Sequence, residues 1–290
     1  MADRFRILVA SDGSPSASAA IDTALAFPWP LASRARGVVA LRESGILGAA
    51  TRGALAAGLR VHAELLQRTL AQRWPGADVA TPNEAPAAAV LNAARRFEAD
   101  AIVLGWRGHG AFTRLLAGSV SRAVAEAAPC PVLVARTAPK AIRRMVVGLD
   151  GTANSRRAVR LLEKLHPPRG NRIFLVHVLT PIALMALGRV PAQTRAMVRE
   201  EVARANAANR RRAQKRLDAA AASLMRRGWH VTRMLRAGDP PGLLLQLVRE
   251  RNADVLVVGA TGKSGVTRVM LGSVAVGALN HSPVPVLIAR

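Results

Sequence analysis

One glycine-containing stretch occurs twice in this chain, and it constrains the fold more than any other feature. Both copies read Gly-x-x-Gly, nine residues and then Gly-Ser-Val, over residues 105–121 and 259–275. Each copy follows a short apolar run, 101–104 in one case and 255–258 in the other. A buried strand that ends in a glycine-rich loop before a helix brings several backbone N–H groups to one point, where phosphate binds well. A single Gly-x-x-Gly would be weak evidence for a phosphate site, because glycine in a turn commonly supplies only a positive φ. Two copies with equal internal spacing are much stronger evidence.

The repeat extends beyond the two loops. Over residues 99–136 the second copy lies 154 positions later without a gap, and 16 of these 38 positions are identical. Asp12 and Asp150, each at the end of an apolar run and before a glycine, lie 138 positions apart. The second half therefore holds 16 additional residues, which are most easily placed around 180–195.

The duplication predicts two domains, 1–138 and 139–290. Half of the residues are hydrophobic, so each domain can bury a core of its own. The linker 137–141 is short enough that the two domains must pack against each other.

Apolar runs and helical patterns alternate in both halves. This order predicts an α/β fold with two tandem doubly wound, Rossmann-like domains, each with a mainly parallel sheet. The expected strands are 5–10, 37–41, 78–81, 101–104 and 132–135, then 144–149, 172–179, 229–235, 255–258 and 284–289. Helices are expected from Ser14 to about Phe27, from about Val61 to before Pro75, from Pro86, over 119–127, around 158–165, over 195–226 and over 241–251. The stretch 43–59 before the second of these helices is expected to be loose.

Ligands of open parallel sheets bind beyond the carboxyl ends of the strands, where the winding reverses. Asp12 and Gly105 are both expected at such ends, and so are Asp150 and Gly259. If the first and fourth strands of each domain are neighbours, Asp12 and Gly105 line one crevice, and Asp150 and Gly259 line another.

The net charge of +24 lies mostly in the second half. Residues 1–138 carry 15 basic and 10 acidic side chains, against 27 and 8 in residues 139–290. Attraction to nucleic acid is one interpretation. The other is compositional, because most of the 42 basic residues are Arg in an alanine-rich chain. Aromatic residues are sparse and Tyr is absent, which argues against a stacking platform for single strands.

No run approaches the ~18 apolar residues of a membrane span, and the N-terminus does not resemble a signal peptide. Cys130 is the one cysteine, so no intrachain disulfide can form; between two prolines it is expected to be a small buried hydrophobe. A cytoplasmic location without membrane contact is the expectation.

Together these residues resemble the universal stress protein family in its tandem two-domain form. The resemblance rests on the Gly-x-x-Gly-x9-Gly-Ser motif after the fourth strand, the Asp-Gly after the first, and a last strand reading Pro-x-Pro-Val-Leu-x-Ala-Arg. It implies five strands per domain and pairing of the two domains through their last strands. In the ATP-binding branch of the family, the motif loop holds the phosphates and ribose, the Asp reaches the nucleotide, and backbone of the second strand meets adenine.

Carried over to this sequence, the resemblance implies two nucleotide sites with ATP, possibly with Mg, as cofactor. The first site would consist of Asp12, Val39, Gly105, Gly108, His109, Gly118, Ser119, Val120 and Ser121. The second would consist of Asp150, Val178, Gly259, Gly262, Lys263, Gly272, Ser273 and Val274. His109 and Arg107 could approach phosphate or be solvated, and Lys263 could offer a cation.

The two copies depart from each other and from the family pattern. Ala275 stands where the first copy has Ser121, so one hydrogen bond of about 1 kcal/mol would be missing at the second site. Trp106 replaces a small residue and could narrow or cover the first site.

Several structural alternatives remain open for these residues. Asp12 and Asp150 could form Asx turns, and Ser119 and Ser273 could serve as helix caps. The remaining histidines show no metal-ligand spacing, and no nucleophile elbow or Walker lysine loop occurs.

The sequence therefore favours a stress-response protein that binds ATP and acts as a regulatory or protective module rather than as an enzyme. Its expected partners are an adenine nucleotide, an unidentified protein and, as an open question, a second tandem chain. The alternatives are a scaffold module without nucleotide and an Arg-rich protein that associates with nucleic acid.

Overall fold

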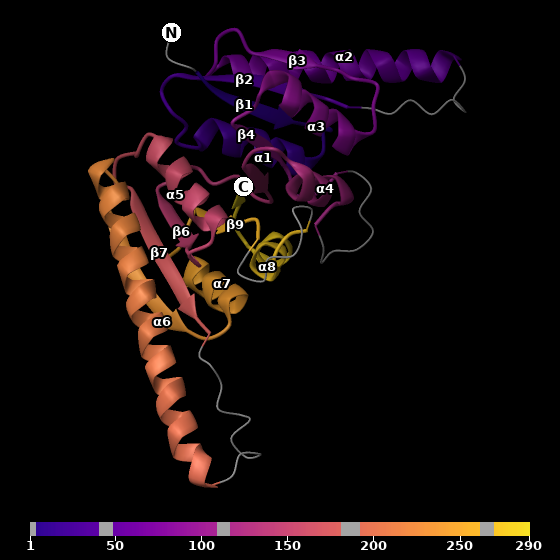
Figure 1. Ribbon diagram of the computed structural model, residues 1–290. Coiled ribbons are helices and arrows are strands. Elements are labelled where there is room, and N and C mark those ends of the chain that lie inside the picture. Colours follow the sequence, from indigo (N-terminus) through magenta and orange to yellow (C-terminus); the bar gives the residue numbers. More distant parts are fainter. Residues whose placement is uncertain (1–3, 41–48, 109–116, 181–191, 262–269) are drawn as a thin grey trace.

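The structure, a computed structural model, describes residues 4–40, 49–108, 117–180, 192–261 and 270–290 (Figure 1). Strands and helices alternate through this part of the chain. The strands are β1 (Phe5–Ala10), β2 (Ser33–Val38), β3 (Asp78–Ala80), β4 (Ala101–Gly105), β5 (Val132–Ala135), β6 (Arg144–Gly148), β7 (Arg172–Leu179), β8 (Val231–Ala237), β9 (Val255–Gly259) and β10 (Val286–Ala289). The helices are α1 (Pro15–Ala26), α2 (Ala49–Ala71), α3 (Pro86–Phe97), α4 (Ser119–Ala127), α5 (Ala153–Lys164), α6 (Ala192–Arg226), α7 (Pro240–Glu250) and α8 (Ser273–His281).

All of these strands belong to one ten-stranded sheet. Its order is β3-β2-β1-β4-β5-β10-β9-β6-β7-β8, so each half contributes five strands in the same relative order. Neighbours within a half are parallel, whereas β5 and β10 pair antiparallel, with Leu133 opposite Leu287. The predicted α/β class with two five-stranded domains is confirmed, and so is the pairing of the last strands.

Helices cover both faces of the sheet, which gives three layers. On one face, α1, α2, α5 and α6 pack over a core that includes Phe27, Leu70, Leu162 and Leu217. On the other face, α3, α4, α7 and α8 pack over a second core. The central strands read as continuous apolar runs because both of their faces are buried.

The predicted helix starts follow from capping. Ser14 Oγ accepts the N–H of Ala17 at 3.2 Å, and Pro15 occupies the first helical position of α1. In the second half, Thr152 Oγ1 accepts the N–H of Ser155 at 3.3 Å at the start of α5. These caps define where α1 and α5 begin after the turns that follow β1 and β6.

Two predictions about the first half were wrong. The second strand covers 33–38 rather than 37–41. It includes Arg34 and Arg36, whose guanidinium groups lie over the ring of Phe97, at 5.1 and 4.9 Å from its centroid. Because the aliphatic parts of arginine side chains can pack on apolar surface, this strand forms although it carries two charges. The stretch expected to be loose up to 59 is helical from Ala49 onward.

Much of the extra length of the second half lies in one helix. α6 has 35 residues, against 23 in the corresponding α2, and it extends beyond the body of the molecule at the lower left of Figure 1. Residues 181–191, where part of the insertion was expected, lie outside the described residues.

The antiparallel junction determines where ligand sites can lie. Strands of the two halves run in opposite directions because β5 and β10 pair antiparallel. The carboxyl ends of the strands of one half therefore lie on the side of the sheet where the strands of the other half begin. Two separate crevices are possible, one at the carboxyl ends of the strands in each half. Among the described helices, none combines the length and apolarity that crossing a bilayer requires.

Candidate functional site

A crevice opens at the carboxyl ends of the strands in the first half. Its volume is about 290 Å³, near the lower limit of small-molecule pockets. It lies between the β1–α1 turn, the end of β2, the start of α3 and the glycine loop. Lining residues are Ala10, Ser11, Asp12, Ala17, Val38, Ala40, Pro86, Val90, Leu104, Gly105, Arg107, Gly108, Gly118, Ser119, Val120 and Ser121.

The second half has a matching crevice of about 280 Å³. Its lining residues are Gly148, Leu149, Asp150, Val176, Val178, Thr180, Pro240, Leu244, Val258, Gly259, Thr261, Gly272, Ser273, Val274 and Ala275. Pro240 and Leu244 lie 154 positions after Pro86 and Val90, so the two linings correspond almost residue by residue. The duplication therefore produces two complete cavities of the same construction.

The two aspartates line these crevices and also form Asx turns. Asp12 Oδ1 accepts the N–H of Ser14 at 3.0 Å. Asp150 Oδ1 accepts the N–H and the hydroxyl of Thr152, at 2.9 and 2.7 Å. Each carboxylate thus orders the turn between strand and helix and at the same time faces the cavity.

Several motif glycines are required by close approach. A Cβ on Gly105 would lie 2.7 Å from the backbone carbon of Ser16, so β4 could not pass the start of α1. A side chain on Gly108 would collide with the carboxylate of Asp12. Gly13 and Gly151, in the turns after the aspartates, have φ of +78° and +83°, a region that favours glycine.

The helices α4 and α8 begin at the crevices with no side chain capping them. Their N-cap residues are Gly118 and Gly272, and neither has a side chain to accept a backbone N–H. The first-turn residues of both helices line the cavities. An uncapped helix N-terminus carries a partial positive charge and N–H donors, which suits a phosphate or another anion.

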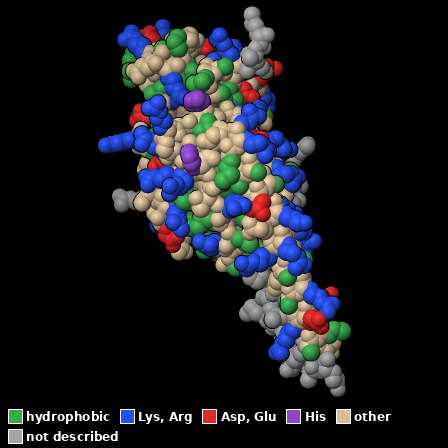
Figure 2. Space-filling model, turned by 90° about the vertical axis from the view of Figure 1, so that its left-hand side faces the viewer, with side chains coloured by type: hydrophobic (Ala, Val, Ile, Leu, Met, Phe, Trp, Pro, Cys, Tyr) green, Lys and Arg blue, Asp and Glu red, His purple; other side chains and the backbone are tan. Residues whose placement is uncertain are grey.

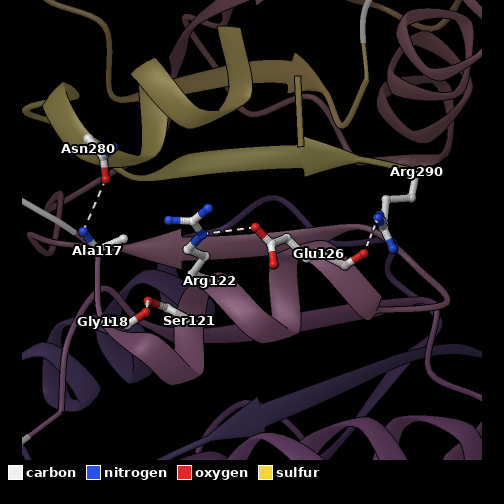
Figure 3. A network of polar contacts seen from close by, with 7 residues as sticks. All are labelled: Ala117, Gly118, Ser121, Arg122, Glu126, Asn280 and Arg290. Atoms are coloured by element: carbon white, nitrogen blue, oxygen red, sulfur yellow. Dashed lines mark hydrogen bonds and ion pairs between the residues drawn. The ribbon is translucent and has the colours of Figure 1, made fainter. Parts of the chain in front are cut away.

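The hydroxyl of Ser121 is used within the first loop. It is 2% exposed and lies 2.8 Å from the carbonyl oxygen of Trp106 and 2.9 Å from that of Gly118 (Figure 3). The corresponding Ala275 is fully buried and can make neither bond. In this structure, the difference between the copies therefore affects the support of the loop.

Trp106 does not cover the first crevice. Its ring lies between the guanidinium groups of Arg107 and Arg136, 3.9 and 3.4 Å from the ring centroid, and its Nε1–H donates to the carbonyl of Leu279 at 2.7 Å. Burial lowers the pKa of Arg136, and the charge of Arg107 lowers it further. The expectation that Trp106 could narrow the site is corrected, because it links the loop to the end of α8.

Further contacts join the first loop to the second half. The N–H of Ala117 donates to Oδ1 of Asn280 at 3.1 Å (Figure 3). Nη2 of Arg136 donates to the carbonyl of Asn280 at 2.7 Å. Arg290 donates in the same way to the carbonyls of Glu126 and Ala128 at the end of α4. Each half thus ends in an arginine that caps the last helix of the other half.

Comparison with known proteins agrees with this geometry. The sequence model of the universal stress protein family matches the chain twice, over residues 4–136 and 141–290. The chain belongs to the universal stress protein family. The two matches correspond to the two halves of the sheet, so the family relation applies to both domains and to their tandem arrangement.

Curated members of the family include two proteins of Mycobacterium tuberculosis. Universal stress protein Rv2005c is 30% identical over 207 residues, which are 67% of this chain and 62% of that protein. Universal stress protein Rv1996 is 28% identical over 203 residues, 65% of this chain and 58% of that protein. The matches thus cover less than two thirds of the length of these relatives.

Solved structures share the fold over nearly the whole chain. A universal stress protein from Archaeoglobus fulgidus superposes with a TM-score of 0.68 at 18% identity, covering 98% of this chain and 96% of that chain. A putative universal stress protein from Pseudomonas aeruginosa gives 0.56 at 14% identity, with 98% and 92% covered. At such identities the comparison supports the architecture of this family member and nothing finer.

Most of the predicted site residues that the structure describes lie in the two crevices. They are Asp12, Gly105, Gly108, Gly118, Ser119, Val120 and Ser121 in the first, and Asp150, Val178, Gly259, Gly272, Ser273 and Val274 in the second. His109, Gly262 and Lys263 lie outside the described residues. The roles proposed for these residues toward a nucleotide stay predictions.

Val39 lies on the other face of the sheet. Its N–H donates to the carbonyl of Ala80 at 2.9 Å, and its side chain is 2% exposed in the core beneath α1 and α2. Val38 and Ala40 line the crevice instead, and Ala40 corresponds to Val178 of the second half.

Sequence reasoning missed part of the crevice walls. Pro86 and Val90 of α3, with their counterparts Pro240 and Leu244 of α7, complete the apolar side of each cavity. Their common displacement of 154 positions was a signal that could have identified them. Within the described residues, no group of three His, Cys, Asp or Glu side chains is arranged to hold a metal ion.

Proposed function

We propose that this chain binds ATP, as Mg-ATP, in the crevices at the two glycine loops. It would act as a nucleotide-dependent regulatory or protective module of the stress response in the cytoplasm, not as a dedicated catalyst. Any hydrolysis of the bound nucleotide would be slow and incidental. The bound nucleotide would bias a conformation or an assembly that a protein partner recognises.

One observation carries the proposal. In each half, an uncapped helix N-terminus, a Gly-Ser sequence and an aspartate meet in a cavity whose other wall is apolar. The helix end suits phosphate. The apolar wall, formed by Val38, Pro86 and Val90 in the first half, suits a flat base.

Among the described lining residues, those of the first crevice favour an anion more strongly. Arg107 lines it, whereas the second crevice has the neutral Thr261 at that position. Arg107 also stacks on Trp106, which restricts where its charge can lie. We therefore expect the first crevice to bind the triphosphate more tightly.

Isothermal titration with Mg-ATP tests the proposal directly. A matched pair of variants, Ala40→Trp and Val178→Trp, fills one crevice each at half-buried corresponding positions. The expected result is binding by the unaltered chain and loss of one site in each variant. Absence of heat from folded protein would show that the crevices are inherited structure in a scaffold module.

A further inference from the structure

A third cavity lies on the opposite face of the sheet, in the second half. Its volume is about 740 Å³, and it lies between α6 and the carboxyl ends of β7 and β8. Its lining residues are His177, Leu179, Thr180, Asn206, Ala207, Asn209, Arg210, Arg212, Arg216 and Ala237. Because side chains alternate along β7, Val176 and Val178 face the second crevice while His177 and Leu179 face this groove.

The groove is cationic. Three arginines of α6 line it, and no acidic residue occurs among its described lining residues. Arg212 donates to Oδ1 of Asn209 at 2.8 Å. Within the described part of the chain, Arg210 and Arg216 form no hydrogen bond or ion pair, unlike Arg204, which pairs with Glu200. Two guanidinium groups therefore face the cavity with their donors available.

Further polar side chains complete the floor and rim. His177 is 1% exposed on β7, beneath the helix. Thr180 and Asn206 add a hydroxyl and an amide at the border of the groove. Guanidinium groups above polar donors form an arrangement that binds phosphate oxygens by several short contacts at once.

The first half lacks this chemistry at the corresponding positions. The residues 154 positions before Asn209, Arg210, Arg212 and Arg216 are Leu55, Ala56, Gly58 and His62. Val39 occupies the position of His177, and it is packed in the core. The residues of the cationic groove thus differ between the two copies, and the groove does not follow from the fold itself.

The surface around α6 is basic as well. Figure 2 shows that Lys and Arg outnumber Asp and Glu among the charged side chains on this side of the molecule. Such a surface raises the local concentration of anions. Within this basic surface, the groove is the place where a cavity could hold an attracted anion.

We propose that this groove is a binding site for a small anion with two or more phosphate groups, separate from the two crevices. The cavity is large enough for such a molecule, and Arg210 and Arg216, about 9 Å apart along the axis of α6, both line it. Its arginines lie on α6, on the other face of the sheet from the second crevice, and Thr180, just after β7, borders both cavities.

Titration with inorganic tripolyphosphate at about 0.15 M salt, an ionic strength that screens diffuse surface charge, tests the site. Arg210→Ala and Arg216→His, which install the first-half residues, are each expected to weaken binding by about tenfold, the loss of one charge-assisted contact. Arg211→Ala is the matched control, since Arg211 is exposed on the same helix but does not line the groove. It is expected to change the affinity by less than about twofold.

Four outcomes would overturn the proposal. Tripolyphosphate could fail to bind folded protein, or bind with no sensitivity to Arg210→Ala, which would place it in the crevices. Equal weakening by Arg211→Ala would show diffuse charge attraction. A duplex DNA that binds more tightly and loses affinity equally in all three variants would make the face a nucleic-acid surface.

Discussion

The two crevices share a backbone framework but differ in what holds their loops. In both, the residue after the first motif glycine bonds to the last strand, from Trp106 N–H to Ala135 and from Ala260 N–H to Ala289, each at 2.8 Å. The side-chain anchors are different. The first loop is tied across the domain junction through Trp106, whereas the second is tied within its own half, by a bond from Asn154 to Thr261.

This difference shows which part of a duplicated site can diverge. The glycines, the helix starts and the aspartates form the cavity, and they occur in both copies. The residues behind the cavity vary, because the two loops contact different neighbours. Stability of the two loops should therefore respond differently to matched substitutions.

The largest effect is expected from Trp106→Ala. It removes a ring that is 8% exposed and its hydrogen bond to Leu279, and gives the first loop the alanine that the second has. We expect the free energy of unfolding to fall by about 3–4 kcal/mol. Urea denaturation followed by circular dichroism measures it. Trp106→Phe, which keeps an aromatic ring, should cost clearly less; equal losses would contradict an essential packing role.

Alanine at the first motif glycine should discriminate between the halves. At Gly105 the new Cβ would lie 2.7–2.9 Å from backbone atoms of Ser16 and Ala17, whereas at Gly259 the nearest atoms of Asn154 and Ser155 are at 3.2 Å. We expect a loss of about 2–3 kcal/mol for Gly105→Ala and about 1 kcal/mol for Gly259→Ala. Thermal unfolding of both variants provides the comparison, and the reverse order would disprove it.

Exchanging the hydroxyl between the copies should give a smaller effect. Ser121→Ala removes the bonds to the carbonyls of Trp106 and Gly118, and is expected to lower stability by about 1 kcal/mol. Ala275→Ser in the second half introduces the same group into a fully buried position. Titration of Mg-ATP into both variants would show whether the hydroxyl also changes affinity; no change in either stability or affinity would leave Ser121 without a role.

The smallest effect concerns Cys130. Its counterpart 154 positions later is Val284, and Cys130 itself is 7% exposed. Burial raises the pKa of the Cys130 thiol to about 12, so almost no thiolate exists at neutral pH. We expect slow reaction with a disulfide reagent in native protein and fast reaction after denaturation. Cys130→Val should change stability by less than about 1 kcal/mol, and rapid native labelling would refute this assignment.

Much of this architecture could be predicted from the chain itself. Strands 5–10 and 172–179 were predicted at their observed ends, because apolar runs that close on Asp-Gly or a polar break are unambiguous. The strand at 33–38 was predicted too late in the sequence, because its two arginines obscure the alternation of buried and exposed positions that marks a strand. Helix α2 was predicted too short because its first turns contain two glycines and little apolar periodicity.

The site was predictable where it follows the repeat and not where it depends on tertiary contacts. The glycines, serines and aspartates of the crevices followed from the repeated motif and from the family resemblance that rests on it. Trp106 was misplaced because its partner, Leu279, lies 173 positions away in the sequence. The wall residues on α3 and α7 were overlooked because prolines and valines at helix starts are common in any α/β chain.

The pairing of β5 with β10 has one more consequence. The two last strands meet along only a few residues, from Val132 to Val134 on one side and Val286 to Ile288 on the other. In separate chains so short a junction would form according to protein concentration. Here the linker after Arg136 fixes an effective concentration in about the millimolar range. The joining of the halves therefore does not depend on protein concentration, and each arginine cap belongs to the same chain as the helix that it contacts.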